Sequence, residues 1–340
     1  MASCKLPNCP VAKDGRCLEG RKADCPNLLP DAPSTVAPAA SPETPRTVRT
    51  LETEKLYSGL PLEITEAREF TRKARAVVVA LAGMKESGKT SLLARLHQQF
   101  QAGPVGGYDF AGSRTLPRFE ELNWLATIES GVNSPKMERS SRQFDNSFLH
   151  FTVRKQKGET APIDVLLNDI SGETFPEAIA AESVCEQLLG LRRADHLAVL
   201  VDGESISNRN LRHDHCAKVK NFIQRVLQTG QIGKQTVLHL VISKLDALTK
   251  AGQQAESTAA VKKLEADFRL LFEKQVATIH YWQLAARPLD GSMPTEEIIA
   301  KLFATWVEST YRHTNFSTNS HITRSPARDF CRFGEQSTAS

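Results

Sequence analysis

The sequence predicts an α/β protein whose mainly parallel β-sheet is flanked by helices on both faces. Between residues 56 and 313, short apolar runs rich in β-branched residues alternate with longer stretches of helical period. Strands of this kind are buried on both faces, which is typical of parallel sheets. A glycine-rich motif follows the first run, and polar motifs follow two later runs. Because ligands bind outside the carboxyl ends of such strands, these motifs predict the position of a functional site.

Each predicted element rests on its own hydrophobic pattern. The predicted strands are residues 76–82, 148–153, 163–168, 196–201, 237–243 and 277–283. The predicted helices are residues 91–101, 178–189, 216–227, 255–272 and 295–308.

Composition divides the chain into four parts. Residues 1–26 contain four of the seven cysteines, and residues 27–55 begin with a stretch rich in Pro, Ala, Ser and Thr that predicts a disordered linker. Residues 56–313 hold the α/β pattern. Residues 314–340 form a polar tail with too little apolar content to bury, which predicts disorder.

Bulk properties exclude several classes of protein. The chain has 340 residues, of which 40% are hydrophobic, so it can bury a sizeable core. Its 43 basic and 39 acidic residues nearly balance, which gives no case for nucleic-acid binding. No apolar run approaches the roughly 18 residues that span a bilayer. We expect no signal peptide, because no apolar stretch follows a positively charged start. We therefore expect a cytosolic protein.

The first strand runs directly into a phosphate-binding loop of the form G-x-x-x-x-G-K-[ST]. Glycines let the backbone wrap around phosphates with its N–H groups inward, and the next helix adds the positive end of its dipole. We expect Lys89 to reach the β- and γ-phosphates and the Thr90 hydroxyl to bind Mg²⁺. The alternative is a glycine-rich turn without a ligand. The predicted nucleotide-binding residues here are Gly83, Met84, Lys85, Glu86, Ser87, Gly88, Lys89, Thr90 and Ser91.

A D-x-x-G motif ends the third predicted strand. Asp169 at the strand end can hold Mg²⁺, and the backbone N–H of Gly172 can reach a γ-phosphate, so the spacing couples the metal to the γ-phosphate. Glu173 follows Gly172 and is the candidate group that orients an attacking water, since a glutamate can accept a hydrogen bond from it. The alternative is that Glu173 faces solvent or pairs with a basic residue.

The fifth predicted strand ends in Ser-Lys-Leu-Asp, close to the [NT]-K-x-D box that recognises guanine. The Asp246 carboxylate can accept hydrogen bonds from guanine N1–H and its exocyclic amine together, and adenine lacks that pair of donors. The stem of Lys244 can lie over the base, while Ser243 replaces the usual Asn or Thr and can still brace the phosphate loop. After the last strand, Ala286 precedes Arg287 and can offer its backbone N–H to guanine O6.

Residues 110–116 are predicted to contain the first nucleotide-sensitive switch, between the phosphate loop and the second predicted strand. Thr115 is the candidate Mg²⁺ ligand of this segment, with Ser113 in reserve. Arg114 can act as an arginine finger from the same chain, or it can be a solvated or structural arginine.

Cysteines near the start of the chain suggest a small zinc knuckle. Cys4, Cys9, Cys17 and Cys25 are separated by four, seven and seven residues, a spacing that departs from the paired C-x2-C form. Free or incidental cysteines are the alternative, since a disulfide fits poorly with a reducing cytosol.

Two further cysteines lie in predicted helical stretches. We expect Cys185 and Cys216 to be buried as small hydrophobes. For residues 213–216, His-Asp-His-Cys, we expect a solvated helix face, because adjacent residues on a helix point apart.

The order of these motifs resembles the translation-factor and Ras-like branch of P-loop GTPases. The sequence is most similar to the bacterial double-GTPase family. The matching stretches, within about residues 59–250, are GLPLEITEAREFTR, GMKESGKTSLLARL, FAGSRTL, LNDISGETF, RRADHLAVLVDGE and VISKLD. The resemblance implies work beside other components in bacterial conflict or signalling systems. Because the chain holds one P-loop motif, it also implies that any second GTPase is a separate chain.

Two functions fit these observations. One is an active, Mg²⁺-dependent GTPase switch in which GTP orders the segments around Thr115 and Gly172 for a protein effector. The other is a non-hydrolysing GTP-binding scaffold that recruits partners through its Cys-rich terminus. The intact Lys89, Thr90 and Asp169 favour the switch, since a scaffold needs no metal site. A small-molecule kinase is disfavoured by the Ser-Lys-Leu-Asp motif.

Overall fold

A computed structural model describes residues 58–73, 75–124, 145–158, 160–248, 254–286 and 295–308, and a few residues among the first 29. The chain divides into two compact units, Met1–Lys55 and Leu56–Ser340. In the first unit, β1 (Ser3–Cys4) pairs antiparallel with β2 (Leu28–Leu29). The predicted tail lies outside the described residues, as does the predicted linker beyond Leu29.

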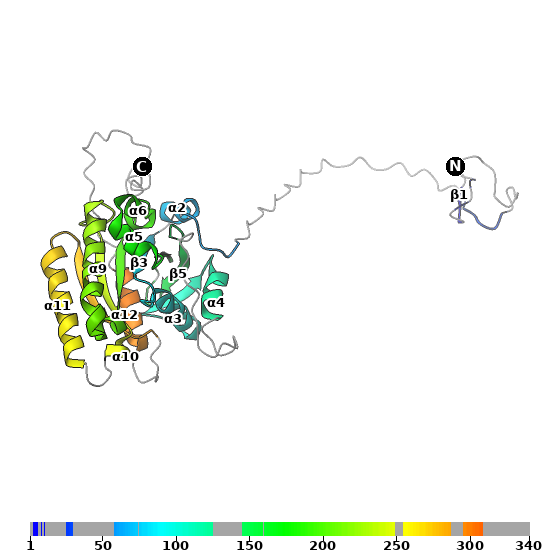
Figure 1. Ribbon diagram of the computed structural model, residues 1–340. Helices are drawn as coiled ribbons and strands as arrows, with labels where there is room; N and C mark the ends of the chain where they lie inside the picture. Colours follow the sequence, from blue (N-terminus) through cyan, green and yellow to red (C-terminus); the bar gives the residue numbers. More distant parts are fainter. Residues whose placement is uncertain are drawn as a thin grey trace. The chain divides into compact units, whose positions relative to one another are not determined.

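The second unit is built on a seven-stranded sheet whose order is β4-β5-β6-β3-β7-β8-β9 (Figure 1). The five strands from β6 to β9 run parallel, while β5 is antiparallel to β6 and β4 is antiparallel to β5. The strands are β3 (Ala76–Gly83), β4 (Tyr108–Gly112), β5 (Leu149–Lys155), β6 (Ile163–Asp169), β7 (His196–Asp202), β8 (Val237–Ser243) and β9 (Thr278–Gln283).

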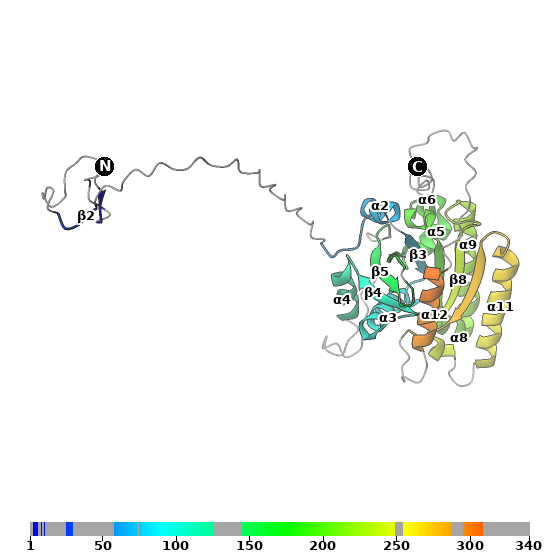
Figure 2. The same cartoon turned by 180° about the vertical axis from the view of Figure 1, so that it is seen from behind.

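Helices cover both faces of this sheet. In Figure 1, α9 and α11 lie side by side on one face, and Figure 2 shows α3 and α12 on the other. None of the helices in the described ranges is both long and apolar enough to cross a membrane. The helices are α2 (Ile64–Lys73), α3 (Lys89–Ala102), α4 (Leu116–Trp124), α5 (Thr174–Ala180), α6 (Glu182–Glu186), α7 (Leu189–Arg192), α8 (Gly203–Ser207), α9 (Arg209–Gln228), α10 (Leu245–Leu248), α11 (Gln254–Phe272) and α12 (Thr295–Glu308).

The predicted α/β class, with its mainly parallel sheet and helices on both faces, is confirmed. One predicted element is wrong, and several elements of the structure have no counterpart among the predicted ones. Among the latter are the helices α2 and α4 and the strand β4, a mostly exposed edge strand with a bulge between Phe110 and Gly112. Residues 178–189 do not form one helix, because Ala181 has an extended backbone (φ −127°, ψ 121°) between α5 and α6.

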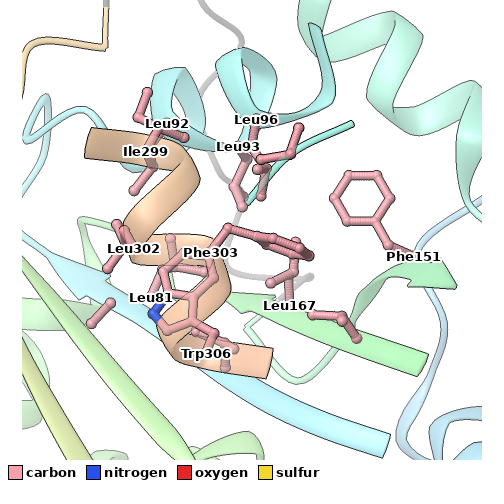
Figure 3. Close-up of a cluster of buried hydrophobic side chains, with 14 of the residues drawn as sticks. Leu81, Leu92, Leu93, Leu96, Phe151, Leu167, Ile299, Leu302, Phe303 and Trp306 are labelled. Atoms are coloured by element: carbon pink, nitrogen blue, oxygen red, sulfur yellow. The ribbon is translucent and has the colours of Figure 1, made fainter. Parts of the chain in front are cut away.

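Hydrophobic side chains form a core on each face of the sheet. On one face, residues of β3, α3, β5, β6 and α12 form a buried cluster (Figure 3). On the other face, side chains of β7, α5, α9, β8 and α11 form a second cluster, and a smaller one lies under α2. The residues labelled in Figure 3 are Leu81, Leu92, Leu93, Leu96, Phe151, Leu167, Ile299, Leu302, Phe303 and Trp306.

Strand register aligns the ends of the parallel strands. Leu81 of β3 lies opposite Asp169, the last residue of β6. Gly83 of β3 lies opposite Leu200 of β7, and Asp202 of β7 lies opposite Ser243 of β8. The segments that follow these strands therefore meet at one edge of the sheet.

A buried chain of hydrogen bonds joins β7, β8 and β9. The indole Nε1 of Trp282 donates to Nδ1 of His239 at 3.1 Å, and Nε2 of His239 lies 3.0 Å from Nδ1 of His196. Because an indole N–H only donates, Nδ1 of His239 must accept, so neutral His239 carries its proton on Nε2 and donates it to His196. Burial lowers the pKa of His196 to about 4 and holds the pKa of His239 well below its ordinary value.

We expect these two histidines to make the fold acid-sensitive. The unfolded chain takes up protons as the pH falls through 6.5, whereas folded His196 stays neutral until about pH 4. The stability that neutral His196 contributes to the folded state is therefore complete above pH 6.5 and is lost as the pH falls toward 4. For His196 alone the loss is about 3 kcal/mol, of which about 2 kcal/mol should be gone by pH 5. Urea unfolding between pH 7.5 and 5 measures this free energy.

His196→Gln should make the unfolding free energy depend less on pH, because glutamine does not titrate. This expectation holds even if the variant is less stable than the parent at pH 7.5. His213, which is exposed on α9, provides the matched control, and His213→Gln should leave the dependence as in the parent. An unfolding free energy of the parent that is equal at pH 7.5 and 5 would contradict this assignment.

Candidate functional site

The predicted phosphate loop lies between the end of β3 and the start of α3. Glu86 has φ 64° and Gly88 has φ 86°, so the backbone takes two left-handed turns within three residues. A Cβ on Gly83 would lie 2.7 Å from the carbonyl oxygen of Leu200, which is closer than side chains tolerate. This position therefore needs glycine, and the tight path directs the chain into the N-terminus of α3.

Lys89 is the positive charge of this loop. Its Nζ donates to the carbonyl oxygens of Gly83 at 2.9 Å and of Met84 at 3.4 Å, and the residue is only 5% exposed. Burial lowers the pKa of Lys89, while the carboxylates of Asp169 and Asp145 act in the opposite direction. A buried ammonium at the start of a helix provides positive charge of the kind that binds anions in proteins.

The candidate metal ligands lie beside this lysine. The Thr90 hydroxyl and Oδ2 of Asp169 are 3.4 Å apart, although the two residues come from different elements, α3 and the end of β6. A hydroxyl and a carboxylate are oxygen ligands of the kind that Mg²⁺ prefers. The donor set therefore fits the predicted ion.

The D-x-x-G segment packs directly against the phosphate loop. A Cβ on Gly172 would lie 2.6 Å from both Cα and N of Lys85. Not even a methyl group fits between the two backbones. The next residue, Glu173, is exposed, and its backbone N–H donates to Oγ of Ser171 at 3.3 Å.

Ser243 neighbours the phosphate loop. Its Cβ is 3.7 Å from the position that a Cβ on Gly88 would take. Its hydroxyl donates to the carbonyl oxygen of Val201 at 3.1 Å. Ser243 thus braces the end of β7.

Lys244 has an uncommon backbone conformation, and its side chain pairs with two acidic residues. Its φ is 48°, and its Nζ lies 3.1 Å from carboxylate oxygens of both Asp202 and Glu204. Burial alone would lower the pKa of Lys244, but Asp202 and Glu204 outweigh it and raise the pKa above its ordinary value. These ion pairs fix the direction of the lysine stem.

His215 supports the same ion-pair network from α9. Its Nε2 accepts the backbone N–H of Asp202 at 3.1 Å, and the residue is buried. Burial lowers the pKa of His215, so the ring is a neutral acceptor. The expectation of a solvated face is wrong for this residue, because helix α9 turns His215 inward. Cys185 is buried as expected, and Cys216 is partly buried.

Asp246 lies in the turn that follows Lys244, and the chain that leads to Ala286 passes beside this turn. Asp246 is partly buried in the first turn of α10. The chain after β9 lies beside this turn, since Leu284 donates its N–H to Ile242 and accepts from the N–H of Leu245 at 3.2 Å. The structure thus brings together the two segments predicted to bind the base. Arg287 lies outside the described residues.

Arg114 and Thr115 lie near β5 and α2. The Arg114 guanidinium lies over the Phe70 ring, 4.4 Å from its centroid, and the Arg114 backbone N–H donates to Nδ1 of His150. The Thr115 hydroxyl is fully buried and accepts the N–H of His150 at 2.9 Å. Arg114 and Ser113 line a cavity of about 260 Å³ that also includes Asp164. Asp164 lies near the start of β6, at the other end of the strand from Asp169.

The predicted zinc site is only partly within the described residues. Cys4 lies in β1, and Cys25 is a free, partly buried cysteine, whereas Cys9 and Cys17 lie outside the described ranges. Among the described residues, no group of three or more His, Cys, Asp or Glu side chains could hold a metal ion. The zinc knuckle stays a prediction.

Sequence reasoning missed four residues that support the site: Asp145, Asp202, Glu204 and His215. Asp202 ends a buried strand and precedes a glycine, a signal that could have pointed to the edge where the other motifs lie. Asp145 has no such signal, because no motif or strand end marks it. Only the fold brings Asp145 near Lys89.

A phosphate loop, a D-x-x-G segment and a base-recognition motif on one edge of a parallel sheet define a P-loop nucleotide-binding protein. A comparison with protein families narrows this class, since the family model described as Double-GTPase 2 matches residues 77–307. The chain belongs to this family of P-loop GTPases.

Other comparisons add little detail. No curated protein matches the chain. A crystal structure of Sup35 complexed with GDP is similar with 14% identity and a TM-score of 0.29, and the match covers 62% of this chain and 37% of that chain. The matched region thus spans well under half of the Sup35 chain.

We expect Gly172→Ala to destabilise the protein, because its methyl group would overlap the Lys85 backbone and force the two loops apart. Overpacking of this kind costs about 1–3 kcal/mol of unfolding free energy, which urea unfolding measures. Gly233→Ala is the control, since the nearest atom to its added Cβ is the Gln235 side chain at 3.8 Å. Equal losses in the two variants would contradict the close packing of Gly172.

Proposed function

We propose that this protein binds GTP with Mg²⁺, hydrolyses it slowly to GDP and phosphate, and acts as a nucleotide-dependent switch for a protein effector. The observation that carries the proposal is the strand register. It brings the phosphate loop, Asp169 and the Ser-Lys-Leu-Asp motif to one edge of the sheet. Membership of a GTPase family supports guanine nucleotides as the ligand.

Phosphate binding falls to the loop between β3 and α3. Its backbone N–H groups and the N-terminus of α3 would surround the phosphates, and Lys89 would contribute its buried charge. When bound, Mg²⁺ neutralises charge on the β- and γ-phosphate oxygens. Thr90 and Asp169 would hold the ion, with Thr115 joining them only if its segment leaves His150.

Base selection falls to Asp246, with help from its neighbours. The carboxylate would accept from both donors on the guanine edge, the stem of Lys244 would cover the base, and Ala286 would offer its backbone N–H to O6. The ion pairs of Lys244 with Asp202 and Glu204 support this role, because they hold the lysine stem in place before a nucleotide arrives.

Hydrolysis would be slow. Glu173 can accept a hydrogen bond from the attacking water, but it cannot donate one to the γ-phosphate, and its charge opposes that of the phosphate. Arg114 stacks on Phe70 and would have to leave that ring to act as an arginine finger. A partner that supplies an arginine would accelerate the reaction. The family resemblance extends the proposal to effectors in bacterial conflict or signalling systems.

We expect Asp246→Asn to lose its preference for guanine, because an amide cannot accept from both donors of the base. The loss of a charged hydrogen-bond partner corresponds to roughly 2–3 kcal/mol, or about a hundredfold in GTP affinity. Affinity for xanthine nucleotides should rise, since their extra carbonyl can accept the amide proton. Competition binding with GTP, XTP and ATP measures the change.

Asp109→Asn removes a charge from the exposed edge strand β4 and serves as the control for Asp246→Asn. It should leave all three affinities as in the parent. A variant Asp246→Asn that prefers GTP as strongly as the parent would remove Asp246 from the base site.

We expect Glu173→Ala to slow hydrolysis tenfold or more and to leave GTP affinity within about twofold of the parent, if Glu173 orients the water. Single-turnover hydrolysis with saturating Mg²⁺ measures the rate, and Glu182→Ala on the exposed start of α6 is the control. Equal rates in parent and Glu173→Ala mean that Glu173 is not catalytic. A parent that binds GTP and never hydrolyses it would favour the scaffold.

A further inference from the structure

The Asp145 carboxylate ties the D-x-x-G segment to the chain that precedes β5. Its Oδ1 accepts the backbone N–H of Ser171 at 2.6 Å, and its Oδ2 accepts the hydroxyl of Thr174. Asp145 is buried, and hydrogen bonds to a buried carboxylate are stronger than those between neutral groups. This contact holds both ends of the short segment that contains Gly172.

Two asparagines fix the turn that carries Asp145. Nδ2 of Asn168, near the end of β6, donates to the carbonyl oxygens of Asp145 and Ser147, both at 2.8 Å. Asn146 bonds the connection between α6 and α7, donating to Gln187 O and accepting from the N–H of Leu189, both at 2.9 Å. Residues 145–147 therefore connect the D-x-x-G segment with α7.

Where Asp145 holds Ser171, Gly172 lies against the phosphate loop. The position of a Cβ on Gly172 is 2.6 Å from the Lys85 backbone, so no phosphate oxygen fits between them. The proposed function requires the Gly172 N–H to face the γ-phosphate of GTP, so Gly172 would have to separate from Lys85. GDP has no γ-phosphate, and its binding does not require this separation.

Charge adds to this steric conflict. The Asp145 carboxylate lies near enough to Lys89 to act on its charge, together with that of Asp169. A γ-phosphate brought to Lys89 would approach a second buried anion, and like charges at short range in a poorly solvated site repel. This repulsion is relieved most directly if the turn of residues 145–147 moves away from Lys89.

We propose that Asp145 is an internal competitor of the γ-phosphate, a latch that holds the D-x-x-G segment closed over the phosphate loop until GTP displaces it. This inference rests on the proposed GTP binding. The latch makes the open, GTP-competent state a minor one, which lowers apparent GTP affinity by the fraction of molecules that are open. GDP binds without this reduction.

Release of the latch changes contacts at the protein surface. Once Asp145 releases Ser171 and Thr174, residues 145–147 keep their bonds to Asn168, Gln187 and Leu189 but lose those to the D-x-x-G segment, so the position of the turn can change. Leu189 is a 42% exposed apolar residue at the start of α7. The nucleotide state thus changes the surface around α7, which is where an effector would sense it.

The test compares two affinities in each variant, for GDP and for a non-hydrolysable GTP analogue, both with Mg²⁺. Asp145→Ala should raise the ratio of GTP-analogue affinity to GDP affinity about tenfold. Thr174→Val removes one of the two bonds without changing charge, so it should raise the ratio by a smaller factor. Asp109→Asn, the surface control, should leave the ratio unchanged. Hydrogen exchange at residues 171–175 and 187–189 should rise when the analogue binds the parent.

The outcomes separate the latch from the function on which it rests. A ratio that stays constant or falls in both Asp145→Ala and Thr174→Val overturns the latch, and a fall would instead make Asp145 a ligand of the GTP–Mg²⁺ complex. If Asp145→Ala does not fold, the ratio in Thr174→Val decides alone. A parent that binds neither nucleotide overturns the proposed function itself.

Discussion

The alignment of four parallel strand ends is the constraint on which the candidate site depends. β3 pairs with β6 on one side and with β7 on the other, and β7 pairs in turn with β8. Each strand is buried on both faces, so a slip of one residue would turn its side chains toward the wrong helix layer. Packing of the core thus fixes the register, and the register brings Gly83, Asp169, Asp202 and Ser243 to one edge.

At that edge, buried charge without a bound anion is costly, and the protein compensates in two ways. Lys89 donates to backbone carbonyls of its own loop and lies near Asp169 and Asp145. Lys244 is neutralised by Asp202 and Glu204. Such pairs contribute little net stability, since desolvation offsets most of the attraction. Their effect is to hold the two lysine side chains in fixed directions.

The sequence was sufficient where an element follows one period without interruption. The bounds of β8 and α12 were predicted to the residue, because each has a continuous apolar pattern. β4 was missed because its residues, Tyr-Asp-Phe-Ala-Gly, are mostly exposed and end in a bulge. Motifs located the candidate site, but Asp145 and His215 act on it through contacts that only the fold creates.

Binding of guanine nucleotide at the aligned strand ends is the property that all the assigned roles require. Nucleotide-free protein should be titrated with GTP and with ATP in the presence of Mg²⁺, beside Lys89→Ala. We expect the parent to bind GTP at least about a hundredfold more tightly than ATP, since adenine leaves Asp246 unpaired. Lys89→Ala should lose GTP affinity by a similar factor. Equal affinity of the parent for GTP and ATP, or unchanged GTP affinity in Lys89→Ala, would contradict it.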